Sequence, residues 1–197
     1  MKSELQEFFN FLKQLFKKPL QTMSRLPSWD SQKTVKFLAL ITCTSGILSG
    51  LLARSISNLI VGALLLPFVA GFLILVASLL ISRLMPILFS KEISQEHIFK
   101  IITISSVPFF LFRIIAAELP PIHLIGFASF CILFTVGMVE NYQVPKHKMM
   151  KIMGAIFGIY FLYWATLLAT SYSKSHSKHI EITSESRQLL EKEFSNP

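Results

Sequence analysis

Five apolar stretches, each close to the length of a bilayer crossing, fill most of the chain between Val35 and Ser171. A hydrocarbon core roughly 30 Å thick needs about 20 apolar residues per spanning helix. The pattern therefore predicts an all-α polytopic membrane protein with spans at about residues 35–53, 57–82, 97–117, 122–139 and 152–171. Together these form one five-helix membrane domain, residues 35–171, between an N-terminal segment, 1–34, and a polar C-terminal tail, 172–197.

The N-terminal segment carries apolar residues at helical spacing, which predicts an amphipathic helix over residues 4–18. The apolar positions are Leu5, Phe8, Phe9, Leu12, Leu15 and Phe16. Lysines 13, 17 and 18 follow, and Pro19 ends the pattern. Two placements remain open: the helix lies in the membrane interface, or it packs on the protein's own loops. Residues 19–34 are interpreted as a linker in which Trp29 lies at headgroup level.

Composition excludes a soluble domain, because 52% of the 197 residues are hydrophobic and the mean hydropathy is +0.57. The net charge of +8 comes mostly from basic residues beside the spans, which favours anionic lipid headgroups as partners over nucleic acid. Cys43 and Cys131 lie inside spans and are interpreted as small apolar residues rather than as a disulfide or metal ligands. No catalytic, cofactor or metal motif is present, so we expect no enzyme and no cofactor.

Basic residues predict the orientation by the positive-inside rule. Thirteen lie in the chain up to Lys36, in the connectors after spans two and four or in the first turn of span three, against five on the opposite side. The thirteen are Lys2, Lys13, Lys17, Lys18, Arg25, Lys33, Lys36, Arg83, Lys91, Lys100, Lys146, Lys148 and Lys151. We therefore expect a cytoplasmic N-terminus and a C-terminus outside.

Arg113 is the only charge well inside a span, which makes it the candidate for an intramembrane polar site. Glu118, five residues on, could pair with it. The pair is interpreted either as a structural anchor or as a site for a lipid headgroup, substrate or partner. A small transporter or channel, with Arg113 lining a polar path and Pro67 and Pro108 breaking helices, is the alternative function.

Two pairs of glycines four residues apart predict close helix packing: Gly46 with Gly50, and Gly154 with Gly158. Packing within the chain is the first interpretation of these pairs, and homo-oligomer contacts are the second. Pro108, after two serines and a valine, is a further packing position.

From the second span onward the chain resembles the Yip-domain family, bacterial type. The resemblance covers about residues 57–172. It rests on the connector and span SKEISQEHIFKIITISSVP ending at Pro108, the proline turn at 119–121, a span with Gly126 and Gly137, and the basic connector VPKHKMMK. The DLYGP-like segment of eukaryotic members and the Trp of bacterial fourth spans are absent.

This resemblance implies a five-helix domain with a cytoplasmic N-terminus, in a bacterial inner membrane. Eukaryotic members are implicated in vesicle traffic and associate with prenylated GTPases, through parts that are not matched here. We therefore expect a non-enzymatic scaffold that interacts with anionic lipids or a protein partner through its cytoplasmic face.

Overall fold

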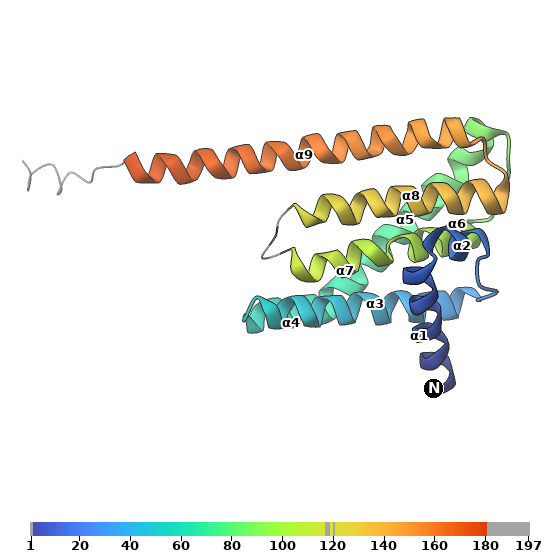
Figure 1. Ribbon diagram of the computed structural model, residues 1–197, viewed down its shortest axis with the longest axis horizontal. Helices are drawn as coiled ribbons and strands as arrows, with labels where there is room; N and C mark the ends of the chain where they lie inside the picture. The colour runs from blue at the N-terminus through green and yellow to red at the C-terminus, as the bar shows by residue number, and fades with distance from the viewer. Residues whose placement is uncertain (1, 117–118, 120, 181–197) are drawn as a thin grey trace, which may run out of the picture. The chain divides into compact units, whose positions relative to one another are not determined.

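The computed structural model describes residues 2–116, 119 and 121–180, and its secondary structure over these residues is helical (Figure 1). The elements are α1 (Lys2–Lys17), α2 (Pro19–Ser24), α3 (Ser31–Leu52), α4 (Ile56–Ile60), the π-helix η1 (Val61–Leu65), α5 (Leu66–Phe89), α6 (Gln95–Ser105), α7 (Val107–Ile115), α8 (Ile122–Tyr142) and α9 (Lys146–Ile180). The all-α prediction is confirmed.

Five helical segments of the described chain are long and apolar enough to cross a membrane, as predicted. They are Ser31–Leu52, Ile56–Phe89, Gln95–Ile115, Ile122–Tyr142 and Lys146–Thr170. The second is longer than the predicted span 57–82, because the apolar run continues beyond Arg83 to Phe89. It ends where Ser90 takes a left-handed conformation, with φ of 53°, a common way for a helix to stop.

The third span is divided into α6 and α7 at Ser106. Pro108 stands in the first turn of α7, where its missing N–H and its ring interrupt the helix ladder. Polar side chains then bond to backbone carbonyls nearby: the Ser106 hydroxyl donates to Thr103 O at 2.8 Å, and Ser45 Oγ of α3 donates to Phe110 O. Such bonds make a broken helix tolerable in lipid.

The chain divides into two compact units, Met1–Phe157 and a second from Gly158 onward. Within the first unit α7 packs between α3 and α8, and α6 packs between α5 and α8 (Figure 1). In the span formed by α6 and α7, 67% of the most apolar stretch of residues is buried. This span is therefore the centre of the first unit. The second unit contains the remainder of α9.

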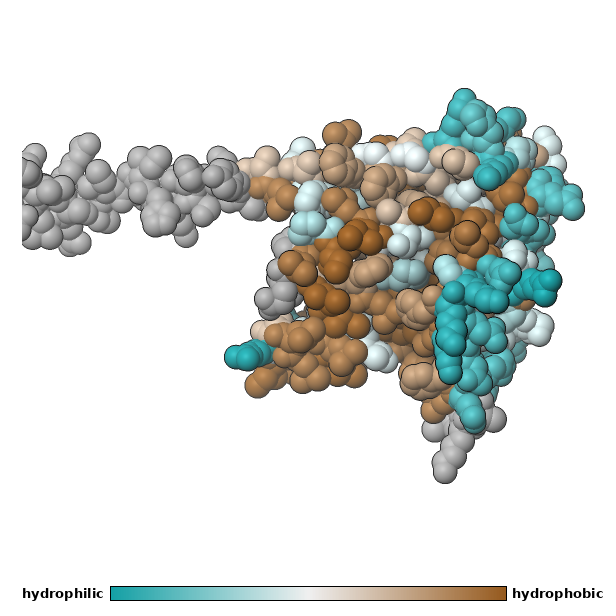
Figure 2. All heavy atoms as spheres, in the orientation of Figure 1, coloured by the Kyte–Doolittle hydropathy of each residue, from teal (hydrophilic) through white to brown (hydrophobic). Residues whose placement is uncertain are grey.

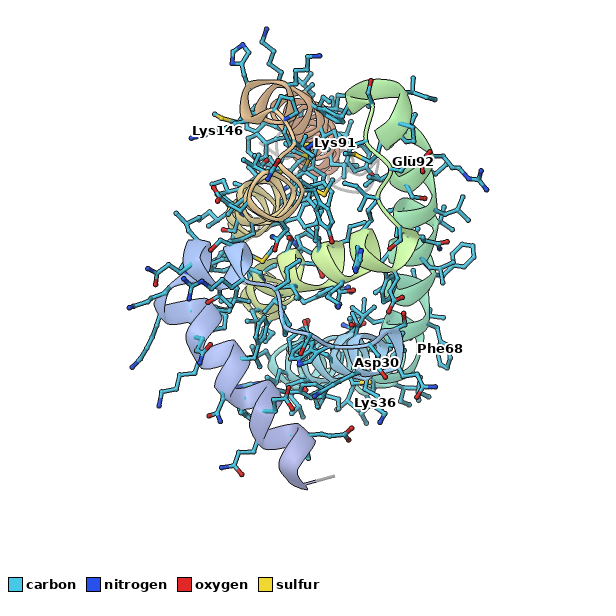
Figure 3. The ribbon with its side chains drawn as sticks, turned by 90° about the vertical axis from the view of Figure 1, so that its right-hand side faces the viewer. Asp30, Lys36, Phe68, Lys91, Glu92 and Lys146 are labelled. Carbon is cyan, nitrogen blue, oxygen red and sulfur yellow. The ribbon has the colours of Figure 1, made fainter. Side chains whose placement is uncertain are left out.

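The segment from α4 to α5 contrasts with this centre, since only 11% of its most apolar stretch is buried. Phe68 is 77% exposed and points away from the bundle (Figure 3). Apolar side chains also cover most of the surface of the first unit in the view of Figure 2. An apolar surface of this extent fits lipid as the solvent, and the protein is an integral membrane protein.

Candidate functional site

Segments far apart in the sequence meet at one end of the first unit, which we call the polar end. Lys91 Nζ donates to the carbonyl oxygens of Tyr142 and Gln143 at 2.7 and 2.9 Å, and so satisfies the end of α8. Asn141 Nδ2 donates to Met23 O at 2.8 Å. The connectors after α5 and α8 therefore lie at the same end as α2, where Figure 2 shows most of the hydrophilic surface and Figure 3 labels Lys91, Glu92 and Lys146.

Helix α1 is docked on the start of α3 by an aromatic cluster. The rings of Phe8 and Phe11 lie 4.8–5.7 Å from those of Trp29 and Phe37. Phe37 is fully buried, and Trp29 is only 4% exposed. The interpretation of Trp29 as a headgroup anchor was wrong, because its indole is a core group. The other side of α1 stays open, with Phe9 67% exposed.

Two ion pairs reinforce the docking of α1. Lys33 Nζ lies 2.6 Å from Glu7 Oε2, and Lys36 Nζ lies 3.3 Å from Glu4 Oε1. Trp29 Nε1 also donates to Glu7 Oε1, at 2.7 Å. The hydrogen bond from Lys33, followed by that from Trp29, lowers the pKa of Glu7 below its usual value. Lys33 and Lys36, counted above as free positive charges, are therefore partnered within the protein.

Three exposed basic residues at this end, Lys17, Lys18 and Arg25, line a groove of about 770 Å³ between α1, α2 and the chain leading to α3. Its lining comprises Phe11, Gln14, Lys17, Lys18, Gln21, Thr22, Ser24, Arg25 and Pro27. Among the described residues, no carboxylate pairs with the three cations. We call it the basic groove. It presents three positive charges and several hydrogen-bonding side chains, a chemistry suited to phosphate-bearing headgroups.

An apolar groove of about 270 Å³ borders the same stretch of chain. It is lined by Leu15, Phe16, Pro19, Leu20, Pro108, Phe112, Ser129, Ile132 and Leu133. Residues 15–20 thus contribute apolar side chains to this groove, while Lys17 and Lys18 contribute charge to the basic groove. The charged groove and the apolar groove are therefore neighbours, and together they suit the two parts of an amphiphilic molecule.

Arg113 lies near the end of α7, at the far end of α3 from the basic groove. It lines a cleft of about 450 Å³ together with Gly46, Ser49, Ala53, Asn58, Val61, Gly62, Leu65, Leu66 and Val69. We call it the Arg113 cleft. Its guanidinium, which is partly buried, forms no hydrogen bond or ion pair with the residues described. Its predicted partner Glu118 lies outside them.

Glycines set the close approach of α3 to α4 and η1 beneath this cleft. A Cβ built on Gly46 would lie 2.0 Å from the carbonyl oxygen of Gly62, and one on Gly50 would lie 2.4 Å from the Cα of Leu59. No side chain fits in those spaces. Gly154 meets nothing within 4 Å among the described atoms, and Gly158 opens the second unit, so packing by this pair stays a prediction.

Comparison with protein families gives a match to the Yip1 domain over residues 13–168. The chain belongs to the Yip1 domain family. Comparison with curated proteins and with solved structures gives no match.

The Yip1 domain match begins earlier than the predicted resemblance, which covered about residues 57–172. It includes the last five residues of α1, from Lys13 to Lys17, together with α2 and all of α3. The Arg113 cleft and the cations of the basic groove therefore lie within the Yip1 domain match, whereas Phe8 and Phe11 of the aromatic cluster precede it.

Sequence reasoning missed several residues that build these sites. It did not find the roles of Glu7, Lys91 or Ser45, because each acts on a partner 22 or more residues away. The one usable signal was the acidic pair at positions 4 and 7 on a helix rich in lysine. Among the described His, Cys, Asp and Glu residues, no group of three could hold a metal ion.

Proposed function

We propose that this Yip1 domain protein is a non-enzymatic membrane scaffold that holds anionic lipid headgroups in the basic groove. The observation that carries the proposal is the set of three cations around one groove, Lys17, Lys18 and Arg25, with which no described carboxylate pairs. Each basic group near an anionic membrane surface contributes about 1 kcal/mol. The neighbouring apolar groove suits a segment of the same lipid, or a lipid-like group on a protein partner.

We further propose that the polar end faces the cytoplasm, in a bacterial inner membrane. The excess of basic residues in the segments that meet at this end supports the orientation. Cysteines introduced for Glu92 and Lys148, in a chain with Cys43 and Cys131 replaced, should react with an impermeant reagent only from the cytoplasmic side. A cysteine introduced for Arg54 should react only from the other side, and a shared side for all three would refute the topology.

The lipid proposal is tested by native mass spectrometry of the whole protein in detergent, titrated with phosphatidylglycerol. Replacing Lys17, Lys18 and Arg25 with Gln should weaken phosphatidylglycerol binding by about fivefold for each charge removed. A deletion of α1 is a poorer test, because it also removes Phe8, Phe11 and Leu15 from the core.

The matched control replaces Lys13, Lys148 and Lys151, which are exposed residues outside the basic groove, with Gln. This triple variant loses the same net charge. If both variants lose affinity equally, binding follows net charge alone and the groove has no special role. If neither loses affinity, the lipid role of this end is refuted.

Transport past Arg113, the alternative function, has less support. From the Arg113 cleft to the polar end, the space between α3, α6 and α7 is occupied by buried apolar side chains, including Phe37, Ile41, Ile101, Ile104 and Phe110. If proteoliposomes show flux of an ion or solute and Arg113→Gln abolishes it, transport would become the better-supported function.

A further inference from the structure

The Arg113 cleft is a second site, distinct from the basic groove and at the other end of α3. Its lining divides into two kinds. Ser49, Asn58 and Arg113 are polar, whereas Val61, Leu65, Leu66 and Val69 are apolar. Leu65 is 55% exposed and Val69 is 44% exposed, so the apolar part opens toward the surrounding lipid.

The charge of the cleft has no counterpart in the part of the chain that the structure describes. No acidic residue lines the cleft, and Arg113 forms no ion pair there. Among the described residues, the charge of Arg113 acts on His123, which is not an anion. A cation in an apolar span is expensive to leave without a partner, so an anionic group bound among these described residues would be stabilised.

The guanidinium lies near the end of the third candidate span, within reach of a lipid phosphate. Arg113 is two residues from the end of α7 at Ile115, about 3 Å along a helix axis. An arginine that near a helix end reaches the headgroup level. Its planar fork can donate two parallel hydrogen bonds to one phosphate group. The side chains of Ser49 and Asn58, which form no hydrogen bond to the described residues, supply further donors.

The backbone that forms one wall of the cleft is irregular. Residues Val61–Leu65 form a π-helix, in which Leu66 N–H bonds to Val61 O five residues back. Such turns are rare and recur at functional sites. Here the turn faces α3 at the Gly46–Gly62 crossing and carries two of the apolar lining residues, Val61 and Leu65.

We propose that the Arg113 cleft binds one anionic phospholipid, with its phosphate on Arg113 and an acyl chain along Leu65, Leu66 and Val69. A lipid whose headgroup carries an ammonium is disfavoured, because none of the described residues that line the cleft has a carboxylate to accept it. A bulk lipid that merely meets a snorkelling arginine would show no such selectivity.

The experiment titrates the whole protein in detergent with phosphatidylglycerol and, separately, with phosphatidylcholine, and counts bound lipid by native mass spectrometry. Phosphatidylglycerol should bind more tightly than phosphatidylcholine. Arg113→Gln should weaken phosphatidylglycerol binding by about tenfold or more, since a hydrogen bond to a charged group is lost. Arg54→Gln, an exposed arginine at the same end outside the cleft, should change it less than twofold.

A second variant keeps the charge and fills the cleft. Val69→Trp should also weaken phosphatidylglycerol binding, and this outcome tests the site even if Arg113→Gln does not fold. Each effect should be the same when Lys17, Lys18 and Arg25 are already Gln, which separates this site from the basic groove.

Three results would overturn the proposal. Equal affinity for the two lipids would remove the anionic selectivity. Equal losses for Arg113→Gln and Arg54→Gln would assign the effect to net charge. Displacement of the lipid by millimolar inorganic phosphate would mean that the site takes a free anion rather than a lipid.

Discussion

The two ends of the first unit differ in how their positively charged side chains are partnered. At the polar end Lys33 and Lys36 are paired with Glu7 and Glu4, and Lys91 is bonded to the carbonyls that end α8. At the other end Arg113 meets no carboxylate among the described residues, and glycines rather than charges hold the helices together. Paired cations stabilise the fold, whereas cations without a partner remain available to a ligand. The polar end has cations of both kinds, because Lys33 and Lys36 dock α1 whereas those of the basic groove pair with no described carboxylate.

The largest expected effect concerns the aromatic cluster at the polar end. Phe37→Ala removes a fully buried ring that contacts Phe8, Phe11 and Trp29, which should lower the free energy of unfolding by about 3–5 kcal/mol. Thermal unfolding in detergent, together with proteolysis of the released α1, measures it. The matched control is Phe9→Ala, at a 67% exposed position on α1, which should change the free energy of unfolding little. Equal stabilities for the two variants would show that α1 is not docked.

An intermediate effect on stability is expected where α3 crosses η1 at Gly46 and Gly62, at the end opposite the polar end. Gly46→Ala places a Cβ against the backbone of Gly62, where no rotamer can relieve the clash. The helices must separate, at about 1–3 kcal/mol, and the Arg113 cleft should change shape with them. Gly71→Ala is the control, because a Cβ there meets nothing within 4 Å. If thermal unfolding shows both variants unchanged, α3 and η1 do not cross this closely.

The smallest expected effect is the pH dependence of the docked α1. The pKa of Glu7 is lowered in the folded protein, so its contribution to stability is present above the unfolded value near 4.5 and is lost as the pH falls through the folded value. Trp29 fluorescence, in a Trp164→Phe background, should therefore change as the pH falls below about 4.5. Glu7→Gln should abolish that change, whereas Glu92→Gln should retain it. If the fluorescence transition persists in Glu7→Gln, it is caused by another titratable group.

The sequence by itself determined the solvent, the class of fold and the number of crossings. Apolar runs of this length must bond their backbone internally in lipid, so helices were the only outcome for these segments. Periodicity also found α1, and the unusual charge in the third span singled out Arg113. The GxxxG spacing pointed to Gly46, although it could not name Gly62 as the partner.

Only the tertiary structure decided which polar groups are paired with each other and which have no partner among the described residues. Glu7 meets Lys33 across 26 residues, and Lys91 meets Gln143 across 52. Such pairings carry no local signal, because the hydropathy of a residue is a property of its own side chain while a contact depends on how two distant helices cross. The same reason explains why Trp29 looked like an interface anchor in the sequence but is buried in the core.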